Sequence, residues 1–171
     1  MRALLFAAAF CAASFSIAHA GDTPVAQMNF FQGCWRGVFA GSATMTDDRC
    51  FEPMQGGANV RDTHAVRGGP GPYGGESIYY LDAQAHKVAV IYFSSDGGVE
   101  RGFAEPDGHG GLVFPPGTYV DADGSTLTLR GSWRPDGPDR YVAISEIEEN
   151  GRWREHLHIT YTRAPDMHAV R

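Results

Sequence analysis

The chain has 171 residues, with 14 Lys or Arg against 20 Asp or Glu, and a formal net charge of −6 at pH 7. This mild acidity, with the basic residues scattered singly, argues against a surface that binds nucleic acid. A chain of this length forms one domain, which buries enough surface to fold without a structural metal.

The N-terminal segment has the pattern of a secretory signal peptide. Arg2 precedes an apolar run over residues 4–13, and Ala18-His19-Ala20 supplies the small residues of a cleavage site. The apolar run is too short to span a bilayer, so we expect no stable membrane insertion. We predict removal of residues 1–20, export to the periplasm or beyond, and a single mature domain over residues 21–171. Lipidation at Cys11 and an uncleaved anchor are the alternatives.

The mature chain begins with one helix signal, and strand signals follow it. Residues 22–31 predict a short helix, because Thr23 is a suitable cap and Pro24 a suitable first helical residue. Its apolar side chains would cover one end of a sheet. A first strand over 34–41, a turn containing Thr44, Asp47 and Asp48, and a second strand over 48–54 come next.

The rest of the chain predicts further short strands separated by tight turns. Val88 to Phe93 is a continuous apolar run, which predicts a strand buried on both faces or packed against the N-terminal helix. Asn150-Gly151 is typical of a two-residue hairpin turn. Apolar and polar residues alternate clearly over 125–133 and over 152–162. The further strands are expected at 58–66, 76–82, 87–94, 98–105, 111–114, 117–121, 125–133, 139–148 and 152–162, of which 111–121 counts alternatively as one bent strand.

Short connections between consecutive strands predict an all-β, antiparallel, up-and-down fold, because a parallel pair needs a long crossover. A meander of about eight to ten twisted strands removes its exposed edges most simply by closing into a barrel. The glycine-rich segment 68–75 is the one long irregular loop, expected over a barrel end. It lacks the residue order of a phosphate-binding loop.

Cys34 and Cys50 are the cysteines that remain after removal of the signal peptide. An even pair in an oxidising compartment predicts a disulfide, which would close a loop of about 15 residues. Two free buried thiols, or one catalytic thiol, are the alternatives. No Cys-x-x-Cys pattern supports redox chemistry.

The opening Gly33-Cys34-Trp35-Arg36-Gly37 resembles the Gly-x-Trp-x-Gly start of calycin-type barrels, which include lipocalins, fatty-acid-binding proteins and nitrobindin-like proteins. The segment from Cys50 to Gly57, with Tyr80-Leu81-Asp82 further on, is similar to small bacterial lipocalin-like domains of unknown function. This resemblance implies a barrel with an internal cavity, and Trp35 packed across its closed end. It implies no reaction.

The nitrobindin-like branch of these barrels binds haem through a histidine on the last strand. By position, His158 or His156 would stand at that place. The resemblance therefore implies haem as an alternative cofactor, while our main prediction has none.

His156 and His158 are two residues apart on one predicted strand face, so both are weak candidates for metal ligands. His64, Glu76 or Glu146 would supply a third ligand. The alternative is an exposed polar stripe, because Arg154 and two threonines share that face.

Four of the acidic residues within the predicted strands are site candidates, and strand alternation alone does not say which of them point inward. An inward carboxylate beside an arginine would orient a ligand's polar head or act as an acid and base. The alternative is cross-strand ion pairing on the outside. Glu52 is the strongest candidate, because Phe51 and Pro53 beside it are not an ordinary polar exterior. The four are Glu52, Asp62, Glu76 and Glu146.

Aromatic side chains would line or fill the interior, and a cavity among them suits a small apolar or planar ligand. These aromatic residues are Trp35, Tyr79, Tyr92, Phe93, Trp133 and Tyr141. The candidate pocket is Trp35, Glu52, Tyr79, Tyr92, Trp133, Glu146 and His158.

We therefore predict an exported lipocalin-like barrel that binds a small hydrophobic or amphipathic molecule without converting it, with no catalytic residue assigned. The alternatives are a haem- or metal-binding barrel, a barrel-type isomerase or cyclase using Glu52 or Glu146, and a structural envelope protein with a filled barrel. The oligomeric state is left open.

Overall fold

The structure is a computed structural model that describes residues 23–169. The predicted signal peptide lies outside these residues. The described chain starts with α1 (Pro24–Gln27) and a 3₁₀ turn, η1 (Asn29–Phe31), and a second 3₁₀ turn, η2 (Gln55–Gly57), follows β2. The strands are β1 (Gly33–Phe39), β2 (Thr46–Met54), β3 (Asn59–Arg67), β4 (Tyr73–Asp82), β5 (Lys87–Ser94), β6 (Val99–Pro106), β7 (Leu112–Val120), β8 (Thr126–Pro135), β9 (Arg140–Glu149) and β10 (Arg152–Arg163).

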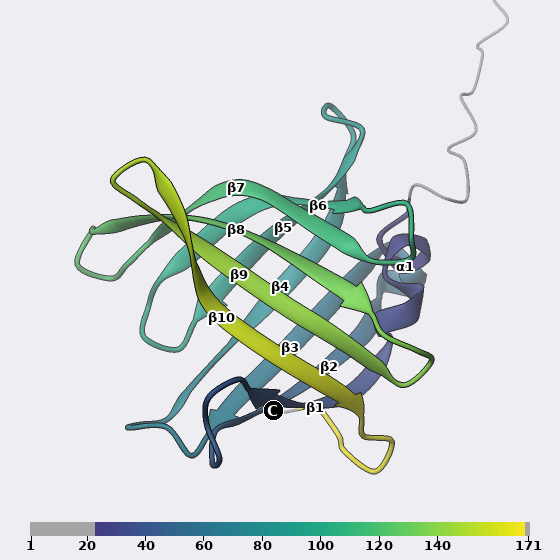
Figure 1. The fold of residues 1–171 in the computed structure, drawn as a ribbon. Helices are drawn as coiled ribbons and strands as arrows, with labels where there is room; N and C mark the ends of the chain where they lie inside the picture. The colour runs from purple at the N-terminus through teal and green to yellow at the C-terminus, as the bar shows by residue number, and fades with distance from the viewer. Residues whose placement is uncertain (1–22, 170–171) are drawn as a thin grey trace, which may run out of the picture.

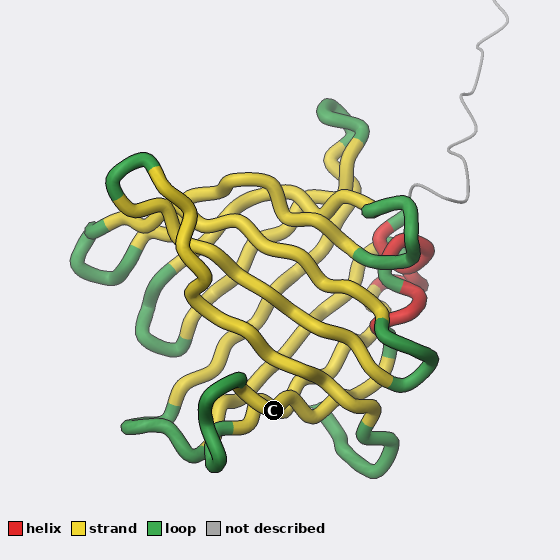
Figure 2. The backbone as a smooth tube through the Cα atoms, viewed as in Figure 1, coloured by secondary structure: helices red, strands yellow, loops and turns green. Residues whose placement is uncertain are grey.

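Each strand pairs antiparallel with the next one along the chain, and β1 also pairs with β10. The sheet therefore closes on itself as a ten-strand barrel (Figure 1). Figure 2 shows that nearly all of the barrel wall is strand, with helix at one end only. The predicted all-β, up-and-down barrel is confirmed, with the strand number at the top of the predicted range.

Two local predictions change in detail. The segment 111–121 is the single strand β7, and its register shifts between Phe114 and Gly117. Pro115 and Pro116 lie at that shift, because proline cannot donate a hydrogen bond to the ladder. The glycine-rich loop is shorter than expected, since β4 already begins at Tyr73.

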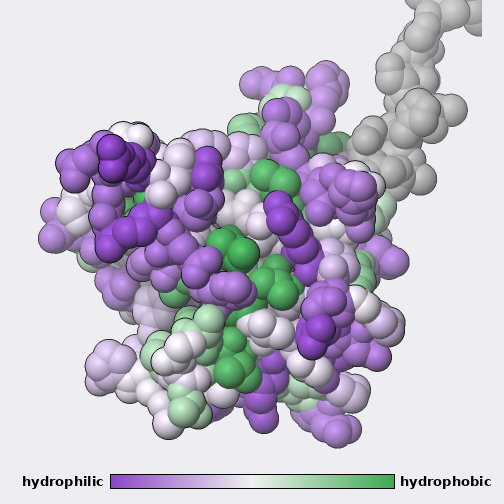
Figure 3. Space-filling view, viewed as in Figure 1, coloured by the Kyte–Doolittle hydropathy of each residue, from purple (hydrophilic) through white to green (hydrophobic). Residues whose placement is uncertain are grey.

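The apolar run on β5 is not buried on both faces. Val88 and Ala89 are buried, but Phe93 is 45% exposed. Tyr92 hydrogen-bonds side chains of the interior, so Phe93, the next residue, points outward. The prediction that Phe93 lines the interior was therefore wrong. The outer face seen in Figure 3 is largely polar, with apolar side chains gathered near its centre.

One end of the barrel is closed by η1 and by the side chains that pack against it. Phe31 and Trp35 are completely buried, and the Trp35 indole Nε1–H donates a hydrogen bond of 2.7 Å to the Phe31 carbonyl. The Arg163 guanidinium lies 3.9 Å from the Trp35 ring and donates hydrogen bonds to the carbonyls of Phe30 and Gln32. We call this part the plugged end. Figure 1 shows α1 beside it and the β5–β6, β7–β8 and β9–β10 loops at the other end.

The second glycine of the Gly-x-Trp-x-Gly opening has a packing reason. A Cβ atom on Gly37 would lie 2.6 Å from the Tyr161 ring and 2.7 Å from Ile159. Only glycine leaves room for Tyr161 at this place, so the motif sets how closely β10 side chains pack over β1.

Cys34 and Cys50 stand directly opposite each other on β1 and β2 and form a disulfide. The predicted disulfide is confirmed, and it links the first two strands. Among the described residues, no helix is long and apolar enough to cross a membrane.

Candidate functional site

Strand β2 directs two charged side chains into the barrel. Phe51 belongs to the apolar core, so alternation also turns Arg49 and Asp47 inward. Asp47 is only 1% exposed. The sequence analysis placed Asp47 in a turn and started the strand at residue 48, whereas β2 begins at Thr46. Counting back in steps of two from Phe51 was the signal that identifies both residues.

Arg49 lies between two buried carboxylates and two aromatic rings. Its Nε is 3.6 Å from Asp47 Oδ2 and 3.5 Å from Asp62 Oδ1. Its guanidinium carbon is 5.1 Å from the Trp133 ring centre and 5.7 Å from that of Tyr161. Burial opposes the charge, but the carboxylate of Asp62 and its neighbours raise the pKa of Arg49 well above its ordinary value. Arg49 is therefore a permanent cation inside the barrel.

A chain of hydrogen bonds connects Asp47 to the surface. The Tyr161 hydroxyl donates to Asp47 Oδ2 at 2.5 Å, and His64 Nδ1 lies 3.0 Å from Asp47 Oδ1. His64 Nε2 is 3.0 Å from the Tyr92 hydroxyl, which lies 3.1 Å from that of Tyr73. Tyr73 is 40% exposed, so the chain reaches solvent. We call Asp47, Arg49, Asp62, His64, Tyr92 and Tyr161 the interior polar cluster.

The interior polar cluster shifts the pKa values of its two aspartates in opposite directions. Burial alone would raise the pKa of Asp47, but the hydrogen bond with His64 and the charge of Arg49 hold that pKa below its ordinary value. For Asp62, burial outweighs the charge of Arg49 and raises the pKa. Burial and the hydrogen bond with Tyr73 raise the pKa of Tyr92, which is therefore a neutral proton donor. The cluster thus holds acceptors, donors and one fixed cation in a small volume.

Several buried polar atoms of this region have no hydrogen-bond partner among the described residues. They include both carboxylate oxygens of Asp62, Nε of Arg49 and the hydroxyl of Tyr141. Asp62 and Tyr141 are each at most 1% exposed. Enclosed polar groups normally find partners, because an unsatisfied one costs free energy. The interior therefore keeps polar groups that packing alone does not explain.

One inward position beside this cluster faces open space. Gly102 lies opposite Val90 and points inward, and a Cβ atom placed on it would meet nothing within 4 Å. The inward residues Leu129 and Ser145 are also only partly buried, although both lie inside the wall. We call the space bordered by Val90, Gly102, Leu129 and Ser145 the lumen.

Glu100 is a further inward carboxyl group on the lumen side. It stands directly opposite Tyr92 on β5 and Tyr119 on β7. Burial raises its pKa. Within the described chain it makes no ion pair. No motif in the sequence pointed to this residue.

The structure brings together four of the seven residues of the predicted pocket. Trp35 and Tyr79 are buried in the interior, and Tyr92 and Trp133 also point inward. Trp133 packs beneath Arg49, and Tyr92 belongs to the interior polar cluster.

The other three predicted pocket residues lie on the outer surface. Glu52 is exposed, because the neighbouring Phe51 takes the inward position. Glu146 accepts a hydrogen bond of 2.6 Å from Arg130 on the outer face. His158 lies beside Glu155 at 3.5 Å, and His156 sits at a register shift of β10 that breaks the alternation predicted there.

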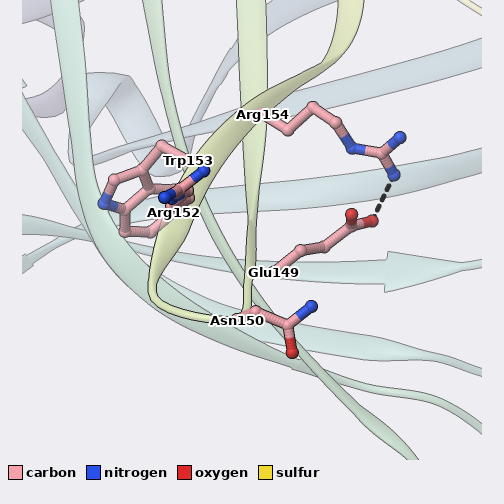
Figure 4. A pocket seen from close by; sticks show the side chains of 5 residues that line it. All are labelled: Glu149, Asn150, Arg152, Trp153 and Arg154. Carbon is pink, nitrogen blue, oxygen red and sulfur yellow. Dashed lines mark hydrogen bonds and ion pairs between the residues drawn. The ribbon is translucent and has the colours of Figure 1, made fainter.

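Two hollows open on the outside of the barrel, away from the interior polar cluster. One, of about 530 Å³, is bordered by the β9–β10 turn, where Arg154 pairs with Glu149 beside Trp153 (Figure 4). The other, of about 480 Å³, crosses the outer faces of β7, β8 and β9 and includes Glu146. Each hollow contains one partly solvated ion pair, Glu149–Arg154 in the first and Arg130–Glu146 in the second, and such pairs recognise a ligand weakly.

Within residues 23–169, no three potential metal-ligating side chains lie close enough to hold an ion. The interior polar cluster and its surroundings consist of carboxylates, one guanidinium, an imidazole, phenols and aromatic rings. No protein-family model matches the chain, and no curated protein matches it either. The closed barrel of ten antiparallel strands is compatible with a lipocalin-like fold.

Proposed function

We propose that this protein is an exported binding protein that holds a small amphipathic molecule in its lumen without converting it. The single observation that carries the proposal is the open space in front of Gly102, next to a buried cluster in which Asp62 and Arg49 Nε have no hydrogen-bond partner among the described residues. Binding sites of this kind combine an apolar wall with a few convergent polar groups. The plugged end closes one end of the barrel. A ligand would therefore enter at the other end, where the β5–β6, β7–β8 and β9–β10 loops lie.

The ligand's apolar part would lie along Val90, Leu129 and Trp133. A polar end that accepts hydrogen bonds would face Arg49, whose side chain is 13% exposed although it is inside the barrel. Asp47 and Asp62 hold the guanidinium from the Nε side. The remaining N–H groups of Arg49 are then free to donate to a ligand, because they make no hydrogen bond with the described residues.

The proposal is tested by filling the lumen. Gly102→Leu places a side chain into space that no atom occupies and replaces a weak strand former by a better one. We expect this variant to fold like the parent and to lose binding of the neutral fluorescent probe N-phenyl-1-naphthylamine by at least tenfold. Arg101→Leu is the matched control, because the same side chain is added one residue away on the exposed outer face.

The natural ligand is then sought by native mass spectrometry of protein purified from its own host. A bound small molecule, released by denaturation and absent from Gly102→Leu, supports the proposal. A parent protein that is consistently empty and binds no displaceable probe contradicts it. Equal probe binding by the parent and Gly102→Leu would place the probe outside the lumen and contradict it as well.

A further inference from the structure

The charges that face the interior do not balance. The buried or partly buried inward positions above the plugged end carry three carboxyl groups, those of Asp47, Asp62 and Glu100, and one guanidinium, that of Arg49. His64 is the remaining ionisable base there, and even its protonation would leave the carboxyl groups in excess. Arg163 does not change this balance, because it is engaged at the plugged end with Asp139 and two carbonyls.

The excess charge can be assigned to particular residues. Asp47 has hydrogen bonds with His64 and Tyr161, and its charge is opposed by Arg49. Asp62 has the Nε of Arg49 at 3.5 Å and His64 and Ser77 as its other polar neighbours, and both of its oxygens are enclosed without a hydrogen-bond partner among the described residues. Glu100 faces the lumen and has no cation near it in the part of the chain that is described. The one guanidinium is thus already shared by two carboxylates.

We propose that the lumen selects ligands with a cationic or neutral polar head, such as an amine, alcohol or amide, and excludes carboxylates. This inference rests on the proposed function and names the ligand class for the same site. A cationic head offsets the cost of burying Glu100, whereas an anionic head adds a further negative charge to a low-dielectric space. A neutral hydroxyl or amide can accept from Arg49 without that penalty.

The test uses three probes with the same twelve-carbon chain: dodecylamine, dodecanol and dodecanoate. We measure how well each probe displaces N-phenyl-1-naphthylamine from the parent protein at pH 7. Each probe is kept below its micellar concentration or solubility limit. We expect the amine and the alcohol to compete at least tenfold better than the carboxylate. Equal or better competition by dodecanoate would overturn the inference, and the proposed function would still stand.

Glu100→Gln shows whether the selection comes from the lumen. We expect this variant to lose several-fold in competition by dodecylamine and to keep its competition by dodecanol. Glu105→Gln is the control, because Glu105 lies on the same strand but pairs with Lys87 on the surface. Equal effects of the two substitutions would overturn the inference. Failure of all three probes and of the reporter to bind the parent would instead overturn the proposed function.

Discussion

The plugged end and the lumen of this barrel are built by opposite rules. At the plugged end, Phe31, Trp35 and Tyr141 pack edge to face at centroid distances near 5 Å. The indole N–H of Trp35 has its partner. In the lumen, inward side chains are partly exposed, and polar atoms of Asp62 and Arg49 have no partner among the described residues.

This difference distinguishes the part of the barrel that stabilises the fold from the part that we propose binds a ligand. Aromatic packing contributes stability directly, and the indole N–H of Trp35 is satisfied there, although the hydroxyl of Tyr141 is not. Buried carboxylates without hydrogen bonds cost stability and are kept where another role requires them. We therefore assign stabilisation to the plugged end and, under the proposed function, ligand binding to the lumen. The following substitutions test this division between the plugged end and the lumen.

The largest expected effect is at the plugged end. Trp35→Ala removes a completely buried indole from the centre of the aromatic packing. We expect a loss of about 3–5 kcal/mol in the free energy of unfolding, because a large cavity is left in a packed region. Urea denaturation of the parent and the variant measures it. A loss below about 1 kcal/mol would show that the plugged end does not stabilise the barrel.

The disulfide beside Trp35 is next in size. Cys34 and Cys50 are separated by 16 positions, and removing the cross-link restores the freedom of that loop in the unfolded chain. The double variant Cys34→Ala, Cys50→Ala should lose about 3 kcal/mol. Probe binding by the folded fraction should be unchanged, because both cysteines lie outside the lumen. A variant that is stable but no longer binds the probe would break the division.

The barrel, its meander order and the disulfide were predictable from the sequence, because each rests on a local signal. Alternation identifies strands, short turns force antiparallel pairing, and two cysteines in an exported chain form one pair. Trp35 was placed at the closed end by a five-residue motif. These features need no knowledge of which strand faces meet across the interior.

The site was harder to predict, because it depends on direction and on distant pairings. A start of β2 misplaced by two residues put Asp47 in a turn, and the pairing of Asp47 with Tyr161 joins residues at opposite ends of the chain. Glu52 was preferred for its apolar neighbours, yet those neighbours are what turn it outward. Tyr92 and Trp133 were predicted to face the interior only as members of the aromatic set, and Phe93, predicted with them, points outward.

The two buried aspartates give the third prediction. Asp47 has a lowered pKa, so its ionised form stabilises the fold above the unfolded pKa of about 3.9, and this contribution is lost as the pH falls through the lowered value. Asp47→Asn should therefore cost about 1.5–3 kcal/mol at pH 7, the range for a hydrogen bond to a charged group, and less in acid.

Asp62→Asn is the control for that substitution. The pKa of Asp62 is raised by burial, so ionised Asp62 lowers stability as the pH rises above about 3.9. Its replacement at pH 7 should cost far less than that of Asp47, or raise stability. Urea unfolding at pH 4 and pH 7 compares the two. A greater loss for Asp62→Asn at pH 7 would mean that Asp62, rather than Asp47, holds the guanidinium in place.

The smallest expected effect concerns Glu100. Burial raises its folded pKa above the unfolded value of about 4.3, so the folded protein holds the proton more tightly and loses stability as the pH rises through the folded pKa. Glu100→Gln removes this loss. Below pH 4 the parent and the variant should be equally stable, and at pH 7 the variant should gain less than about 1 kcal/mol. Urea midpoints at both values measure the gain, with Glu105→Gln as the surface control. The division between the plugged end and the lumen requires a residue such as Glu100. It lowers stability at pH 7 and yet sets which ligand head group the lumen accepts. Lower stability of Glu100→Gln than of the parent at pH 7 would place Glu100 among the stabilising residues instead.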